Sequence, residues 1–155
     1  MTLPETTPIL LCYDRSDGSR HAIETAARLF PGHTAIVLHI WSPVAIMASV
    51  YGGGVLMPVY DDSALQEAAA TVAEEGVALA TGAGLSAQAQ TTESAYEGTW
   101  HAILEVADGC DAGIIVLGAR GLSTFKSIVL GSVSHGVAQH ARRPVLIVPP
   151  ATSPA

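Results

Sequence analysis

The chain has 155 residues, the usual length of one domain, and 49% of them are hydrophobic, enough for a full core. Only 14% are charged, and the formal net charge of −7 argues against a nucleic-acid partner, whose phosphates require a basic surface. We therefore interpret residues 1–155 as a single domain, with its core over 8–149 and a loose tail at 150–155.

Charge is distributed unevenly along the chain. All 14 acidic residues and three arginines lie in residues 1–111. Residues 112–155 have no acid and four cations: Arg120, Lys126, Arg142 and Arg143. An anionic ligand is therefore expected to bind near the C-terminal third of the chain.

Nothing in the sequence indicates export or membrane insertion. The N-terminus lacks the positive segment and apolar run of a signal peptide. Residues 34–60 are uncharged, but Pro43, Pro58 and Gly52–Gly54 oppose a membrane helix. Cys12 and Cys110 are expected to be buried free thiols in a reducing compartment. We expect a cytoplasmic protein.

The first half of the chain alternates between strand and helix patterns. The continuous apolar run Ile9–Tyr13 predicts a strand buried on both faces. After the turn Asp14–Gly18, apolar residues at helical spacing predict a helix that ends at Pro31–Gly32, with Ser16 or Asp17 as its N-cap. Ala35–Trp41 reads as a second strand.

A long apolar loop is predicted over residues 42–62, and loops of this length in compact domains are usually functional or mobile. A helix follows from Ser63 to about Gly82. Ser63 and Gln66 have the spacing of a capping box. Leu65, Val72 and Leu79 are expected to form its buried stripe.

The second half repeats the alternation. It predicts an edge strand at 86–92, a helix from 99 to about 107, a strand at 114–117, a helix from 133 to about 141 and a strand at 145–148. Five strands alternating with four helices indicate a parallel sheet with right-handed crossovers. Ligands bind at the carboxyl ends of such strands, which here are marked by Asp14, by Ile40 and Trp41, and by Gly118.

The most informative motif is Gly118-Ala-Arg-Gly121, followed after nine residues by Gly131-Ser132. It connects the fourth strand to the fourth helix. Glycines allow the backbone to approach a ligand closely, and the amides at the helix start can bind an anion. Arg120 and Lys126 add positive charge. The motif therefore predicts a site for phosphate groups.

These residues resemble the universal stress protein family. Gly118, Gly121, Gly131 and Ser132 match its Gly-x2-Gly-x9-Gly-Ser/Thr motif, and Asp14-x-Ser16-x-x-Ser19 resembles its first turn. The resemblance covers residues 8–149. It implies a Rossmann-like, open five-stranded parallel sheet of order 3-2-1-4-5, with helices on both faces. It also implies ATP binding and a homodimer formed through the last strand, Val145–Val148.

The family resemblance also implies positions for the ligand. Asp14 is expected beside the adenosine and the end of the second strand near the base, with ribose and phosphates at the glycine motif. The expected binding residues are Asp14, Ser16, Ile40, Trp41, Gly118, Arg120, Gly121, Gly131, Ser132, Val133 and Ser134. The ligand is expected to be ATP, with AMP, ADP and cyclic AMP as alternatives. Mg²⁺ is expected only together with the nucleotide, assisted by Asp14 or Asp17.

Simpler interpretations remain open for several residues. The glycines and Ser132 could serve packing and helix capping alone, Asp14 could cap the first helix, and Trp41 could be a core or interface residue. No catalytic residue is predicted. The favoured function is a nucleotide-responsive regulator in stress adaptation. The alternatives are an interaction or dimerisation module with an incidental nucleotide, and a slow ATPase in which His135 would orient water.

Overall fold

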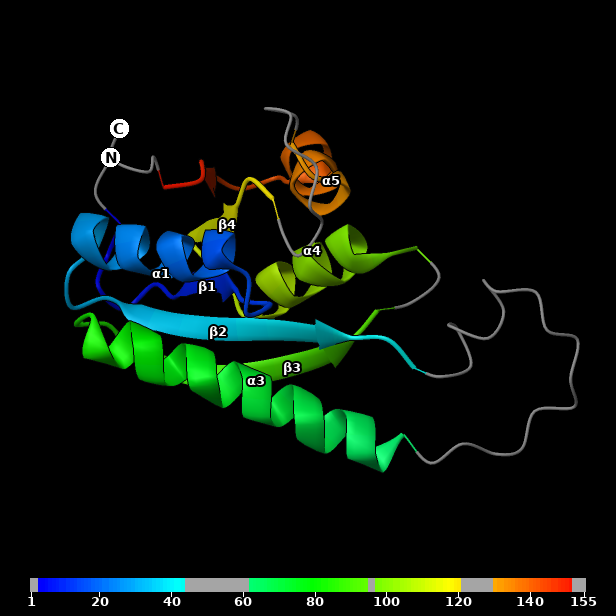
Figure 1. Cartoon of the computed structure of the whole chain (residues 1–155). Helices are drawn as coiled ribbons and strands as arrows, with labels where there is room; N and C mark the ends of the chain where they lie inside the picture. The colour runs from blue at the N-terminus through cyan, green and yellow to red at the C-terminus, as the bar shows by residue number, and fades with distance from the viewer. Residues whose placement is uncertain (1–2, 44–61, 95–96, 121–129, 152–155) are drawn as a thin grey trace, which may run out of the picture.

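The computed structural model describes residues 3–43, 62–94, 97–120 and 130–151. These residues form an all-parallel, five-stranded sheet of order β3-β2-β1-β4-β5 (Figure 1). The strands are β1 (Ile9–Cys12), β2 (Thr34–Trp41), β3 (Ser86–Glu93), β4 (Ile114–Gly118) and β5 (Val145–Val148). The expected fold class and strand order are confirmed.

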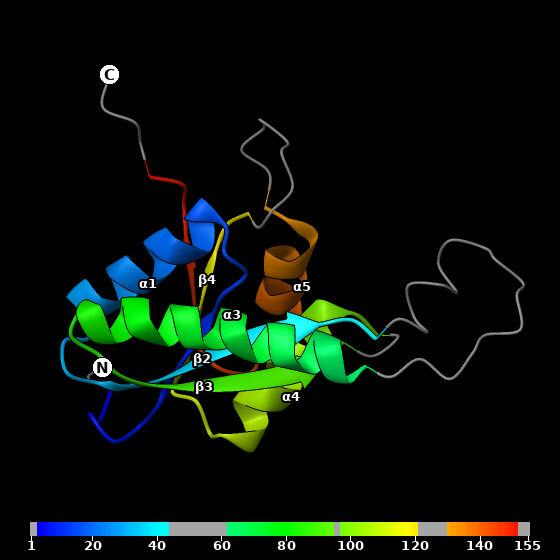
Figure 2. The ribbon, with the colours of Figure 1, turned by 60° about the horizontal axis from the view of Figure 1, so that its bottom comes forward.

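Within the described residues, two helices cover each face of the sheet. The helices are α1 (Asp17–Leu29), α3 (Ser63–Gly82), α4 (Thr99–Gly109) and α5 (Ser132–His140). Helices α1 and α3 pack on one face, and α4 and α5 pack on the other (Figures 1 and 2). Because every crossover joins parallel strands, the carboxyl ends of all five strands lie at the same end of the sheet, the carboxyl edge.

Strand β1 lies at the centre of the sheet, between β2 and β4. Its side chains alternate between two apolar layers: Ile9 and Leu11 face α1 and α3, and Leu10 faces α4 and α5. All three are at most 1% exposed. Burying each such side chain contributes roughly 1.5–3 kcal/mol. This double burial explains why the strand has no polar alternation.

Strand β3 lies at one edge of the sheet, as its glutamine- and threonine-rich sequence predicts, and β5 lies at the other. The side chains of β3 are exposed or half-buried along its whole length. In β5, Val148 is buried, whereas the other three residues remain partly exposed.

Helix α3 differs from its prediction in two respects. Its N-cap is Asp62, so Ser63 is the first helical residue and does not occupy the capping position. Of the predicted stripe, Val72 is buried, but Leu65 is only partly buried and Leu79 is 37% exposed. The buried face consists of small residues and one valine: Ala69, Val72, Ala73, Gly76 and Ala80. A Cβ atom at position 76 would lie 2.6 Å from Val37 Cγ1. The helix therefore packs so closely on the sheet that its buried face favours small residues over large apolar ones.

The central part of the predicted apolar loop, residues 44–61, lies outside the described residues, as do most of the tail and residues 121–129. Within the described part of the chain, no helix is both long and apolar enough to cross a membrane.

Candidate functional site

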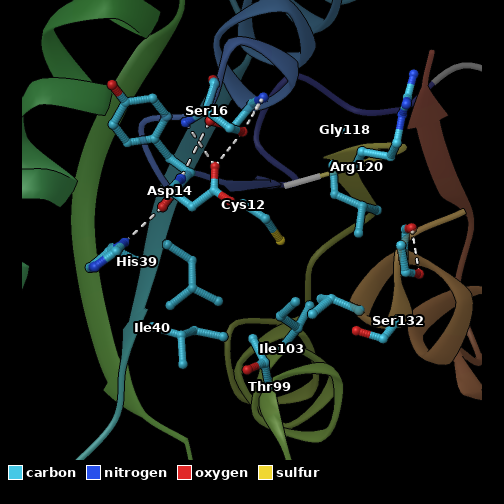
Figure 3. Close-up of a pocket in the computed structure, with 17 residues that line it drawn as sticks. Cys12, Asp14, Ser16, His39, Ile40, Thr99, Ile103, Gly118, Arg120 and Ser132 are labelled. Atoms are coloured by element: carbon cyan, nitrogen blue, oxygen red, sulfur yellow. Dashed lines mark hydrogen bonds between the residues drawn. The ribbon is translucent and has the colours of Figure 1, made fainter. Parts of the chain in front are cut away.

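A cavity of about 290 Å³ opens at the carboxyl edge of the sheet (Figure 3). It lies where the chain direction across the sheet reverses, between β1, whose crossover leads to β2, and β4, whose crossover leads to β5. Parallel α/β sheets bind ligands at such a switch point. Two turns border the cavity: the turn from β1 to α1 and the turn from β4 to α5.

The β1–α1 turn is held by side-chain hydrogen bonds. Asp14 Oδ1 accepts from the backbone N–H of Ser16 at 3.0 Å and from the Ser16 hydroxyl. The Ser16 side chain in turn accepts from Ser19 N at 3.1 Å and caps α1. Ser16 is therefore the N-cap, and the simpler interpretation that Asp14 caps this helix is wrong. Asp14 instead holds the turn at the cavity wall.

Arg15 adopts a left-handed backbone conformation, with φ at 67°. Its guanidinium forms a two-pronged ion pair with Glu75 on α3, in which Nε donates to Oε2 at 2.7 Å. This hydrogen bonding lowers the pKa of Glu75 and raises that of Arg15. The arginine side chain is therefore directed to α3, which ties the turn to that helix.

A second contact anchors the same turn to β2. His39 Nδ1 lies 2.8 Å from the Tyr13 carbonyl oxygen. A carbonyl can only accept, so Nδ1 carries the proton. The Tyr13 N–H donates to Leu38 O at 2.9 Å. Hydrogen bonds to β2 therefore hold both the N–H and the carbonyl group of Tyr13, the residue before Asp14.

The β4–α5 turn is closed mainly by backbone groups. Gly131 N donates to Ala119 O at 2.9 Å. The buried Ser134 hydroxyl lies 2.8 Å from the same carbonyl oxygen and 3.0 Å from Gly131 O. Ser134 therefore joins the two ends of the segment between residues 119 and 131 and positions the start of α5.

Helix α5 begins at the cavity, with Gly131 as its N-cap and no side-chain cap. The interpretation that Ser132 serves only as an N-cap is therefore wrong. The Ser132 hydroxyl points toward the cavity (Figure 3). The first amides of a helix lack intrahelical acceptors, and the positive end of the helix dipole lies beside them. This corner of the cavity therefore suits an anionic group.

The opposite wall is apolar and comes from the α4–α5 face of the sheet. It consists of Cys12, Leu38, Ile40, Ile103, Leu117 and Val133. Burial raises the pKa of the Cys12 thiol to about 12, and the neighbouring Asp14 carboxylate adds to the shift. Cys12 is therefore an apolar wall residue at neutral pH. A flat apolar group fits this side better than a charged one.

Nine of the eleven predicted binding residues line the cavity: Asp14, Ser16, Ile40, Gly118, Arg120, Gly131, Ser132, Val133 and Ser134. Trp41 is not among the lining residues. Side chains alternate along a strand, so Trp41 projects from the opposite face of β2 to Ile40. Gly121 lies outside the described residues.

Sequence reasoning missed several lining residues, most clearly Thr99 and Ile103 on α4 and Cys12 on β1. The helical period of α4 gave a signal for Ile103 as an inward-facing residue, but not for its position at a cavity. Thr99 carried no such signal. His135, the candidate for orienting water, is exposed and does not line the cavity. Across the described ranges, no three His, Cys, Asp or Glu side chains gather as metal ligands.

Residues 5–149 match the family model of the Universal stress protein family. The chain belongs to the universal stress protein family. It is 33% identical over 147 residues to the universal stress protein YxiE of Bacillus subtilis. That alignment covers 90% of this chain and 97% of YxiE. The family resemblance seen in the glycine motif is thereby confirmed.

Two solved structures share the fold of this chain. The structure of the protein MJ0577 matches with a TM-score of 0.74 at 22% identity, covering 97% of this chain and all of MJ0577. The universal stress protein from Archaeoglobus fulgidus, solved in complex with dAMP, matches with a TM-score of 0.64 at 24% identity. That match covers 93% of this chain and 98% of the Archaeoglobus protein.

Proposed function

We propose that this universal stress protein binds an adenine nucleotide, ATP in the first place, and acts as a nucleotide-responsive regulator of stress adaptation in the cytoplasm. The observation that carries the proposal is the cavity of about 290 Å³ at the switch point, in which an apolar wall faces the N-terminus of α5. This volume is near the lower limit for ligand pockets, roughly 300 Å³. The dAMP complex of the Archaeoglobus relative supports the choice of an adenine nucleotide.

The two turns would hold different parts of the nucleotide. Asp14 and Ser16 would contact the adenosine, with Ile40 against the base. Ribose and phosphates would lie at the β4–α5 turn, beside Gly118, Gly121 and the start of α5. This assignment places the flat, weakly polar base on the apolar wall and the anionic group at the helix amides.

Charge near the β4–α5 turn is compatible with the same orientation. Arg120 lines the cavity on this side, but its guanidinium is directed away from the other lining residues (Figure 3), so it would have to turn toward a phosphate to bind it. Mg²⁺, where bound, would be held through phosphate oxygens, assisted by Asp14 or Asp17, since magnesium in proteins commonly binds substrate phosphates and one or two carboxylates. AMP, ADP and cyclic AMP present the same base to the apolar wall and are the alternatives to ATP.

The direct test is to denature the purified protein and identify the released small molecules by mass spectrometry. We expect ATP, or another adenine nucleotide, at close to one per chain. If none is released, titration calorimetry with millimolar ATP, ADP, AMP and cyclic AMP decides the matter. No heat of binding with any of the four would overturn the proposal.

Ser132 gives a variant that tests the location of the site. Ser132→Ala removes a hydroxyl that does not cap α5, so the fold should remain intact. We expect weaker ATP binding in calorimetry. Gly109→Ala is a matched control, because Gly109 ends α4 and its added Cβ would meet nothing within 4 Å. Equal ATP affinity in Ser132→Ala and the control would place the ligand elsewhere.

An apolar, partly exposed edge strand supports a second role, in assembly. We propose that β5 joins a second copy of the chain into a homodimer, because three of its four residues remain partly exposed at the sheet edge. Pairing would protect an edge otherwise prone to aggregation. Light scattering at micromolar concentration should give twice the monomer mass. A monomer mass would contradict this assignment and weaken the interaction-module alternative.

A further inference from the structure

The two turns of the cavity touch through backbone at Gly18, in the first turn of α1. A Cβ atom added at position 18 would lie 2.6 Å from the carbonyl oxygen of Arg120. From the other side, a Cβ atom at Gly118 would lie 2.8 Å from the carbonyl carbon of Gly18 and 2.9 Å from its oxygen. Real Cβ atoms essentially never approach other atoms this closely. The contact therefore requires glycine on both sides.

Local structure gives no reason for glycine at position 18. Gly18 is the second residue of α1, a helical position where alanine is more favourable. Its φ lies outside the left-handed region, so the backbone does not require glycine. Gly82 and Gly109, the last residues of α3 and α4, have open space around the Cβ position. Gly18 differs from both because another backbone occupies that space.

We infer that Gly18 is a positioning residue, which sets the separation between the Asp14–Ser16 side of the cavity and the Gly118–Ser132 side. This inference rests on the proposed nucleotide binding. Arg120 and Gly118 line the cavity on one side of the contact, and Ser16 lines it on the other. Gly18 itself is not a lining residue, so it acts through the position of the β4–α5 turn.

A methyl group at position 18 would push the Arg120 carbonyl away by at least a few tenths of an ångström. The obstacle is backbone, which cannot rotate away as the end of a long side chain can. Binding groups must be held within about 0.5 Å of the productive geometry. The displacement falls on the phosphate side, whereas Asp14 and Ser16 stay fixed by their own hydrogen bonds.

The test compares ATP with adenosine in Gly18→Ala, using calorimetry on the full chain. Adenosine lacks the phosphates, so it depends less on the displaced turn. We expect the ratio of ATP affinity to adenosine affinity to fall about tenfold relative to wild type. Gly82→Ala is the matched control and should leave the ratio unchanged. Partial unfolding lowers the apparent affinity for both ligands by the same factor, so the ratio does not report on stability.

The outcomes separate this inference from the function on which it rests. If wild type binds neither ATP nor adenosine, the proposed nucleotide binding fails. If wild type binds ATP and Gly18→Ala retains the wild-type ratio, Gly18 has no positioning role, whatever the loss of stability. A lowered ratio in Gly18→Ala with an unchanged ratio in Gly82→Ala supports the inference.

Discussion

The two turns that border the cavity are built in different ways. The β1–α1 turn relies on side chains: Asp14 holds Ser16, and Ser16 caps α1. In the described part of the β4–α5 turn, backbone groups and the Ser134 hydroxyl hold the two ends together. Gly118 lies where this turn contacts Gly18 in the first turn of α1. Both turns follow central strands of the same sheet.

Under the proposed nucleotide binding, this difference would correspond to two kinds of recognition. Side chains that are fixed by hydrogen bonds can bind a single polar atom of a ligand from one direction, which suits the polar atoms of an adenosine. Glycines and helix amides present backbone donors at close range to an anion of any orientation. We therefore expect substitutions in the β4–α5 turn to act on phosphate binding and those in the β1–α1 turn to act on every adenine ligand.

The largest effect is expected from Gly131→Val. Gly131 has an extended backbone with φ at −61°, so valine is accepted by the backbone itself. A Cβ atom there would meet its nearest neighbours at 3.6–3.7 Å, but the two methyl groups of valine require further space at the start of α5. We expect ATP affinity to fall about 100-fold, because a displacement of about 1 Å can cost this much. Calorimetry measures the change.

Gly131→Ala is the matched control for this substitution. Its single Cβ makes ordinary van der Waals contacts, so ATP affinity should stay within about threefold of wild type if sterics decide the effect. Equal, large losses in both variants would instead indicate that the phosphate occupies the Cβ position. Unchanged affinity in Gly131→Val would remove this turn from the binding site.

A smaller effect is expected from the serines that hold each turn. Ser16→Ala removes a helix cap, and Ser134→Ala removes a buried donor, so each should lower the free energy of unfolding by about 1 kcal/mol. Urea unfolding measures this, with the exposed Ser86→Ala as control. Calorimetry should show that Ser134→Ala weakens ATP more than adenosine, and that Ser16→Ala weakens both. The reverse pattern would contradict the division between the turns.

The sequence was sufficient to predict the sheet because its signals are local. The apolar run Ile9–Tyr13 indicated a strand buried on both faces, and the run at 114–117 indicated another strand. The glycine motif indicated a turn that borders the cavity. The strand order came from the family resemblance. On α3, Val72 is buried as predicted, but Leu65 and Leu79 are not, because the close approach at Gly76 favours small side chains on the buried face.

The site was predictable where polar residues follow strands, and less so elsewhere. Asp14 and Ser132 could be predicted as binding residues because Asp14 follows the apolar run of the first strand and Ser132 completes the glycine motif. Thr99 reaches the cavity only through the packing of α4, which no local pattern reveals. The contact of Gly18 with Arg120 joins residues about 100 positions apart, so sequence reasoning gave Gly18 no role beyond its place in a turn.

The alkylation rate of Cys12 measures whether the cavity is occupied, and no lining residue has to be mutated. Its pKa of about 12 leaves roughly one thiol in 10⁴ ionised at pH 8, and the thiolate is the reactive form. In Cys110→Ser, alkylation of Cys12 by iodoacetamide should be slow and should accelerate about tenfold per unit between pH 8 and 10. Saturating ATP should slow it further. Labelling at the same rate with and without ATP would place the nucleotide away from the apolar wall.

The smallest effect is expected at the ion pair that ties the β1–α1 turn to α3. Because Arg15 lowers the pKa of Glu75 in the folded state, the pair stabilises the protein above the unfolded pKa of glutamate and loses that contribution as pH falls through the folded value. Both side chains are nearly half exposed, so solvent screens the gain. In urea unfolding, Glu75→Gln should therefore differ slightly from wild type at pH 7 and less at pH 3.

The neighbouring exposed residue gives the control for this small difference. Glu74→Gln changes the net charge of α3 by the same amount without touching Arg15, so it should not reproduce the pH dependence. High salt should reduce the Glu75→Gln difference at pH 7. A difference that is the same at both pH values would mean that Glu75 acts through packing, and the β1–α1 turn would then hold its shape without a charge on α3.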